Sequence, residues 1–190
     1  MQMEMNTEQG IQPVTQETAR SLTTRYGTKN LRFITDLLDA LGHTPHSYAN
    51  LTDNPSSTST SLRIFLHRDD IKVSKAKTIV DTLGYTLIIR LYDRLPEIAA
   101  SPDRNYVVKI PKEIDLGTQG NSKYPNLGFL DDYMKRHKLS RRGLAEKLQL
   151  SPGAVFTWFK QDDIAVSYLN KIKDTFDAVL EFNIRKKLDN

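Results

Sequence analysis

The stretch Leu144–Phe159, LAEKLQLSPGAVFTWF, decides the fold that we expect for this chain. It predicts two short amphipathic helices joined by a tight turn, because apolar residues recur at the three- and four-residue spacing of a helical face. Serine followed by proline at Ser151-Pro152 predicts the start of the second helix, since serine caps free backbone N–H groups and proline fits the first helical position. Two helices of about two turns each are unstable alone. Further helices must therefore close a core over them.

The composition is typical of a soluble globular protein. The 190 residues are 38% hydrophobic and 26% charged, with a net charge of +4. The absence of cysteine excludes disulfides and cysteine-based zinc sites. No run approaches the ~18 apolar residues of a membrane span, and the polar N-terminus lacks the apolar core of a signal peptide. We therefore expect a cytoplasmic protein with no membrane partner.

Breaks in the hydrophobic pattern divide the chain into four parts. Residues 1–28 are expected to form a flexible tail that contains a candidate short helix at 16–26. A first helical unit at 29–92 is followed by a linker at 93–124, which is rich in proline and glycine, and by a second unit at 125–190 with a basic C-terminal end.

Within these parts the residue pattern predicts mostly helices. Residues 43–61 are expected to be a loop with one short helix. The helices are expected at 31–41, 47–51, from 62 to about 66, 71–83, 129–137, 140–148, 151–160 and 166–179, and extended segments at 85–91, 106–110 and 180–184.

The two units are related in sequence. DDIAVSYLNKIKDTFDAVLEF at 162–182 aligns without a gap to DDIKVSKAKTIVDTLGYTLII at 69–89, and Trp158-Phe159 matches Phe65-Leu66. A three-residue insertion around 53–57 restores the register further back. The chain is therefore a degenerate tandem repeat of one helical unit of about 60 residues. We predict a mainly α fold of two tandem helix-turn-helix bundles, whose trailing extended segments pair with each other or across a dimer.

The second unit resembles the lambda-repressor-like (Cro-type, Xre-type) helix-turn-helix DNA-binding family. The residues that carry the resemblance are Leu139-Ser140, Leu144-Ala145, Leu148, Leu150-Ser151, Val155, Trp158, Val166-Ser167, Leu169 and Ile172. The first unit resembles the family more faintly, through residues 62–83. The resemblance implies five-helix bundles whose third helix enters the DNA major groove, and Trp158 is then a core residue.

The chain departs from the family at two places. Many members bury an arginine against a glutamate, and here those positions hold Met134 and Phe159, or Leu38 and Leu66 in the first unit. A hydrophobic pair replaces such an ion pair at little cost. Gln161-Asp162-Asp163 stands where members usually have glycine and basic residues, which argues against a phosphate contact there.

The resemblance assigns a DNA-binding surface to the second unit. Arg141 starts the helix at which members grip phosphate. The expected contact residues are Arg141, Arg142, Ser151, Pro152, Gly153, Phe156, Thr157 and Lys160. On the outer face of the third helix, only Ser151 and Thr157 offer side-chain hydrogen bonds to base edges, while Phe156 suits a thymine methyl group or a protein partner. Residues 129–160 hold seven basic and three acidic side chains, and their net charge of +4 favours an anionic partner.

The equivalent surface of the first unit is chemically different. It carries Thr58, Ser59, Thr60, Arg63, Ile64, His67 and Arg68. Arg63 is the best candidate for guanine recognition in the chain. The alternative is that this unit serves for pairing or for positioning the other one.

The expected function is that of a bacterial or phage transcription regulator that binds double-stranded DNA, acts near the nucleoid, can form a homodimer and needs no cofactor. The alternatives are a protein-interaction module of a virion or antitoxin-type assembly, and an architectural protein that binds DNA without sequence preference. Nothing in the sequence indicates an enzyme. The acidic pairs Asp69-Asp70 and Asp162-Asp163 suit helix N-termini better than acid–base chemistry, and His43 and His46 lack a third metal ligand.

Overall fold

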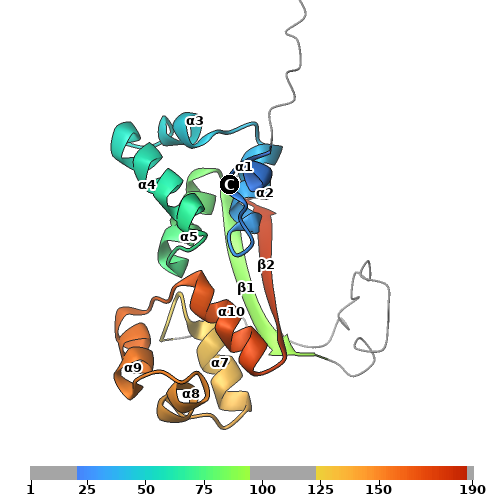
Figure 1. Cartoon of the computed structure of the whole chain (residues 1–190), viewed down its shortest axis with the longest axis vertical. Helices are drawn as coiled ribbons and strands as arrows, with labels where there is room; N and C mark the ends of the chain where they lie inside the picture. Colours follow the sequence, from blue (N-terminus) through green and yellow to red (C-terminus); the bar gives the residue numbers. More distant parts are fainter. Residues whose placement is uncertain (1–20, 95–122, 188–190) are drawn as a thin grey trace, which may run out of the picture.

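The computed structural model describes residues 21–94 and 123–187, and these are mainly helical with a small two-stranded sheet (Figure 1). The first unit comprises α1 (Leu22–Tyr26), α2 (Arg32–Ala40), α3 (Pro45–Ala49), α4 (Pro55–Arg68), α5 (Val73–Thr82) and β1 (Tyr85–Asp93). The second comprises α7 (Gly128–Arg136), α8 (Arg141–Lys147), α9 (Pro152–Gln161), α10 (Val166–Thr175) and β2 (Ala178–Lys186). The extended segment expected at 106–110 lies outside the described residues. None of the described helices is long and apolar enough to cross a membrane.

Helix α4 begins well before the position that the sequence predicts. Residues 55–61 were expected to be loop, and they form the first two turns of the helix. Pro55 occupies the first helical position, where its missing N–H costs no hydrogen bond. The Thr60 hydroxyl donates to the Ser56 carbonyl at 3.0 Å. The insertion around 53–57 is thus accommodated by a longer α4 rather than by a longer loop.

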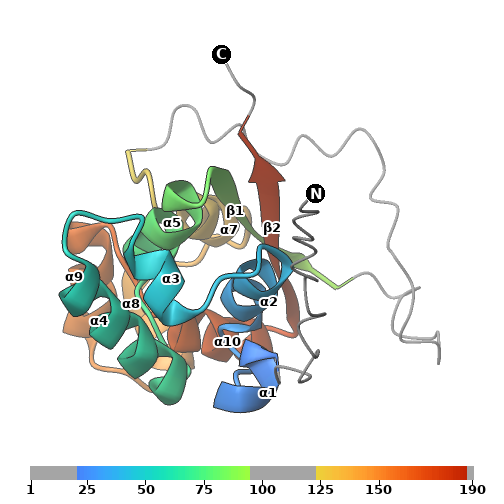
Figure 2. The same cartoon turned by 90° about the horizontal axis from the view of Figure 1, so that it is seen from above.

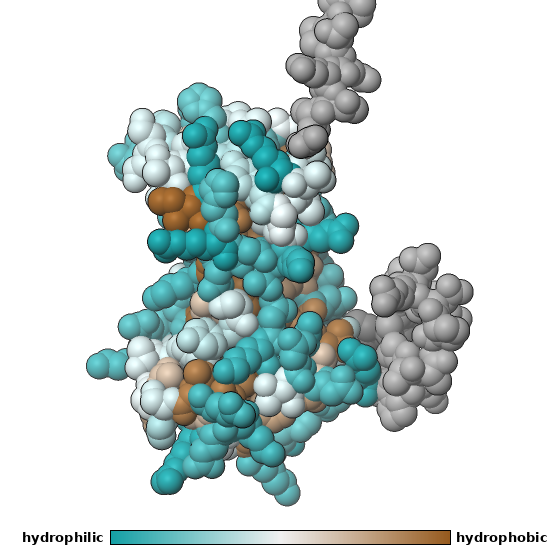
Figure 3. Space-filling model, viewed as in Figure 1, coloured by the Kyte–Doolittle hydropathy of each residue, from teal (hydrophilic) through white to brown (hydrophobic). Residues whose placement is uncertain are grey.

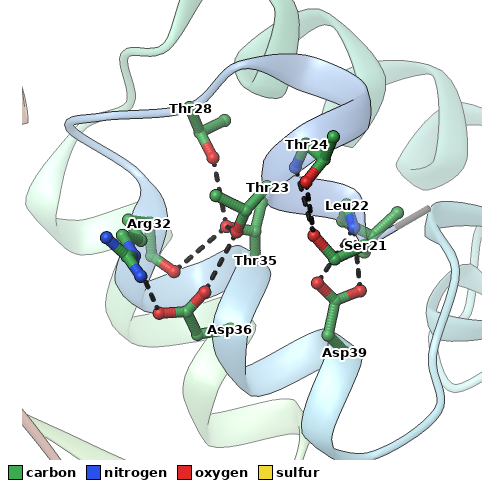
Figure 4. Close-up of polar contacts among 9 residues, drawn as sticks. All are labelled: Ser21, Leu22, Thr23, Thr24, Thr28, Arg32, Thr35, Asp36 and Asp39. Atoms are coloured by element: carbon green, nitrogen blue, oxygen red, sulfur yellow. Dashed lines mark hydrogen bonds and ion pairs between the residues drawn. The ribbon is translucent and has the colours of Figure 1, made fainter.

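The first unit also includes residues that the sequence assigns to the tail. Helix α1 packs on α2, and the Leu22 N–H donates to both carboxylate oxygens of Asp39 at 3.0 and 2.9 Å (Figure 4). The Thr35 hydroxyl shares hydrogen bonds with the hydroxyls of Thr23 (2.6 Å) and Thr28 (3.1 Å). Leu22 and Thr28 are buried. The short helix expected at 16–26 is therefore present over its described C-terminal part.

The buried apolar residues of both units and of β1 form one core cluster. Leu38 and Leu66 are fully buried in the first unit, and Met134 and Phe159 are buried in the second, so the residues that stand where many lambda-repressor-like proteins have an ion pair are apolar and buried here. Trp158 is 8% exposed and its ring lies 5.0 Å from that of Tyr168. This confirms Trp158 as a core residue.

The two strands pair with each other inside the chain. β1 and β2 are antiparallel, with Tyr85 opposite Lys186, Ile89 opposite Phe182 and Asp93 opposite Ala178. This is the first of the two pairings that the sequence left open. Helix α10 ends earlier and β2 begins earlier than predicted, because Asp177 adopts a left-handed φ of 47° and turns the chain.

Each strand also contacts a helix of the other unit: β2 contacts α2, and β1 contacts α7. The Phe182 ring of β2 stacks on Phe33 of α2, with ring centres 4.3 Å apart and planes 1° from parallel. At the far end of the ribbon, Arg136 of α7 donates to the Leu91 carbonyl of β1 at 2.9 Å. Each strand therefore packs on its own unit and also contacts the other one, and Figure 1 shows both strands running along the two units.

Candidate nucleic-acid interface

An approximate two-fold axis relates the two units. Equivalent residues are 93 positions apart from Asp69 onward, as Asp69 and Asp162 illustrate. Lys72 and its equivalent Ala165 form an isolated antiparallel bridge. The Val73 N–H donates to Ile164 and the Val166 N–H donates to Ile71, both at 2.8 Å. Ile89 and Phe182, which face each other in the ribbon, are also equivalent. The axis therefore passes through the bridge and the middle of the ribbon.

The second aspartate of each acidic pair accepts hydrogen bonds from the other unit, across this axis. The Asp163 carboxylate accepts from the N–H and hydroxyl of Ser74, at 3.0 and 2.6 Å, at the start of α5. Asp70 accepts from the N–H and hydroxyl of Ser167, at 3.0 and 2.7 Å, at the start of α10. Each unit thus caps a helix of the other, where the helix dipole favours a negative charge.

The first aspartate of each pair caps a helix within its own unit. Asp69 accepts from the backbone N–H groups of residues 29–31, which lead into α2, at 2.9 to 3.0 Å. Asp162 accepts from those of residues 126 and 127, which lead into α7, at 3.0 to 3.2 Å. Together the four carboxylates confirm the helix N-terminal role that the sequence favours.

The symmetry puts α4 and α9 on one side of the molecule. In both Figure 1 and Figure 2 these helices lie on the same side, away from the β1–β2 ribbon. Figure 3 shows apolar patches over α4 and over α8 and α9 within a mostly hydrophilic surface. The residues expected to contact DNA come mainly from α4 and α9.

Most of the expected contact residues of the second unit are exposed along α9. They are Ser151, Pro152, Gly153, Phe156, Thr157 and Lys160. The Phe156 side chain is 51% exposed. The Thr157 hydroxyl donates to the Gly153 carbonyl at 2.8 Å, so its donor is used within the helix. This surface therefore combines an apolar ring with one cation.

Arg141 is held against aromatic rings instead of extending into solvent. Its guanidinium carbon lies 4.4 Å from the ring centre of Phe159, 5.5 Å from that of Tyr124 and 5.7 Å from that of Phe156. It also donates a hydrogen bond to the Tyr124 hydroxyl. The side chain is half-buried, and such contacts of a cation with ring faces are stabilising. Arg141 thus packs in the unit, while the exposed Arg142 pairs with Glu146 at 3.0 Å.

The contact residues expected in the first unit divide between the two sides of α4. Thr60, Arg63, Ile64, His67 and Arg68 are exposed, with Ile64 at 42%.

Ser59 is 8% exposed and lies on the buried side of α4 with Leu62 and Leu66. The expectation that Ser59 contacts DNA was wrong, because its spacing to those leucines puts it on the core side. The half-buried Thr58 hydroxyl accepts from Thr52 at 3.0 Å. The Arg63 side chain forms no hydrogen bond or ion pair within the described residues.

Part of the basic cluster at 129–160 faces elsewhere. Lys135 pairs with Asp131 at 2.6 Å, and Arg136 is directed to the ribbon. The +4 net charge is therefore not all on the surface of α8 and α9.

Lys72 was not among the residues expected to contact DNA. It is exposed at the two-fold axis and donates to Gln161 at the end of α9 at 3.4 Å. The repeat alignment pairs Lys72 with Ala165, and this was the one sequence feature that could have pointed to Lys72.

Comparisons with known proteins gave no match to a family model, a curated protein or a solved structure. Among the described residues, no group of three or more histidine, aspartate or glutamate side chains is placed to hold a metal ion.

Proposed function

We propose that this chain is a transcription regulator that binds double-stranded DNA with α4 and α9, each acting as the second helix of a helix-turn-helix. One observation supports this most strongly: a two-fold axis relates the pairs α3–α4 and α8–α9, and α4 and α9 lie on the same side of the molecule (Figures 1 and 2). Dimeric helix-turn-helix proteins use such an arrangement to read two half-sites about one helical turn apart. Here one chain supplies both units.

The exposed cations suit the phosphate backbone. Arg68 is exposed on α4, and Lys160 is exposed on α9. Arg142 and Lys147 are exposed on α8. Each contact with a phosphate releases counterions, so binding through these side chains weakens steeply with salt. The resemblance to the lambda-repressor-like family agrees with this role and with a location at the nucleoid of a bacterial cell.

The first test is fluorescence-anisotropy binding to random duplexes at several salt concentrations, followed by selection of the tightest binders. We expect a selected duplex to bind more than ~10³-fold tighter than random DNA. Arg63→Ala should remove much of that preference. Arg185→Ala is the matched control, because Arg185 is equally a solvent-exposed arginine but lies at the end of β2. Absence of binding at low salt would refute the proposal.

Two other functions make different predictions in the same assay. The exposure of Phe156 and Ile64 favours a protein partner for the same helices. In that case Phe156→Ala would abolish partner binding and leave the salt dependence of DNA binding unchanged. Steep salt dependence without enrichment of any sequence would instead indicate an architectural protein.

A further inference from the structure

We propose that the chain binds as a monomer to a duplex whose two half-sites differ, and therefore binds it in a single orientation. This inference rests on the proposed DNA-binding function and specifies the class of site. A homodimer of identical helices reads a palindrome, since its two-fold symmetry is that of the operator. The symmetry of this chain holds for the backbone and for the contacts across the axis, but not for the exposed side chains of α4 and α9.

The backbone symmetry is close. The bridge at the axis has two equivalent hydrogen bonds of 2.8 Å each. The crosswise bonds also come in equivalent pairs, from Ser74 to Asp163 and from Ser167 to Asp70, and they differ by 0.1 Å or less. The two units are therefore placed to meet DNA in the same manner.

The side chains of α4 and α9 differ at every equivalent exposed position. The pairs are Thr60 and Gly153, Arg63 and Phe156, Ile64 and Thr157, His67 and Lys160, and Arg68 and Gln161. α4 also has an additional turn at its N-terminus. The surface formed by α4 and α9 is therefore not two-fold symmetric.

The pair Arg63 and Phe156 has the clearest consequence for DNA. A free arginine in the major groove donates two hydrogen bonds to guanine O6 and N7, while an apolar ring contacts the methyl group of thymine. Phe156 has no group that can hydrogen-bond to guanine. The half-site under α4 should therefore contain a guanine where the half-site under α9 contains a thymine.

The intramolecular ribbon explains why one chain suffices. The pairing of β1 with β2 uses one edge of each strand, and Asp70 and Asp163 already bond across the axis. Contacts that would hold two separate protomers together are thus made within one chain. The complex should contain one protein molecule per duplex.

Tethered cleavage tests the orientation. The chain has no cysteine, so single variants can carry an iron–EDTA reagent at one defined place. Leu51→Cys and Lys147→Cys form a matched pair, because both residues are exposed and occupy equivalent positions beside the turns that precede α4 and α9. On the selected duplex we expect each reagent to cleave one half only, and the two reagents to cleave opposite halves. Equal cleavage of both halves by either reagent would overturn the proposal.

Symmetrised duplexes provide the second measurement. Duplicating either half of the selected site should weaken binding by about 5- to 150-fold, the effect of one mismatched contact. Phe156→Arg should reverse the preference and favour the duplicated α4 half, and Arg63→Phe should favour the duplicated α9 half. A selected site that is a palindrome, bound by two chains, would overturn this inference while leaving DNA binding intact. Failure to select any duplex would instead refute the proposed function.

Discussion

At the residue scale, the crosswise aspartates join the units. Asp163 is 9% exposed and accepts hydrogen bonds from Ser74 and from the Ile164 N–H at 3.1 Å. We expect Asp163→Ala to lower the free energy of unfolding by about 1–2 kcal/mol, the usual effect of losing a helix cap. Asp70→Ala should act similarly. Urea denaturation measures this, with the exposed Asp53→Ala as control, and equal effects of Asp163→Ala and the control would contradict the prediction.

A second residue-scale prediction concerns alkaline pH. Burial raises the pKa of Tyr133 to about 12, and the carboxylate of Asp93, 3.4 Å from the hydroxyl, adds to the rise. Between the ordinary value of 10 and about 12, the unfolded chain releases the phenolic proton and the folded chain retains it. The free energy of unfolding should therefore fall through this window, by about 1.4 kcal/mol per pH unit from this group.

Tyr133→Phe isolates the effect, because it removes the ionisable hydroxyl and retains the ring. Below pH 10 the group contributes no pH dependence, so the variant and the parent chain should have parallel stability profiles there. Above pH 10 the variant should lose stability less steeply. Urea unfolding at pH 9, 10 and 11 makes this comparison. Identical slopes above pH 10 would show that Tyr133 is not protected from ionisation.

At the scale of elements, the contact of β2 with the first unit predicts an effect across units. Phe182 belongs to β2 but stacks on Phe33 of α2. Phe182→Ala should lower the free energy of unfolding by about 2–3 kcal/mol, less than the ~3–5 kcal/mol of a fully buried phenylalanine, because Phe182 is half-buried. Amide hydrogen exchange should become faster in α2. Val179→Ala, also in β2, is the control, and faster hydrogen exchange confined to the second unit would contradict a stabilising role for the Phe33–Phe182 contact.

Most elements were predictable because their apolar residues follow one period. α2, α5 and α7 to α9 lie where the helical spacing indicates, and the β-branched run at 85–91 is a strand. The start of α4 was not predictable in this way, because serine and threonine favour turns and caps when considered alone. Helix formation there depends on Pro55 and on burial of Ser59 in the core.

The candidate surface was predictable only in part. The repeat places Arg63 and Phe156 at equivalent positions, and both are exposed on their helices, while their contact with DNA stays a prediction. Sequence spacing did not reveal that Arg141 packs among aromatic rings, because Tyr124 lies in the stretch assigned to the linker. Nor did it reveal that Asp70 and Asp163 cross between units, since a repeat alone does not say which copy a carboxylate caps.

At the scale of the whole molecule, the ribbon and the crosswise bonds fix the distance between α4 and α9. A linker of about 30 residues alone would let two units adapt to many spacings. Here the units are joined instead by paired strands and by Asp70 and Asp163. Under the proposed DNA-binding function, bivalent binding should therefore require one spacing of the half-sites, since the gain from a second unit disappears when geometry forbids both contacts.

Insertions between the half-sites test this directly. Five base pairs rotate the second half-site by about half a turn, and ten restore its face but move it about 34 Å away. We expect both insertions to reduce affinity to that of an isolated half-site, a loss of at least about 100-fold. Substituting central base pairs without changing the length is the control. If the ten-base-pair insertion instead kept nearly full affinity, the ribbon would have to open on DNA and the two units would bind as independent modules.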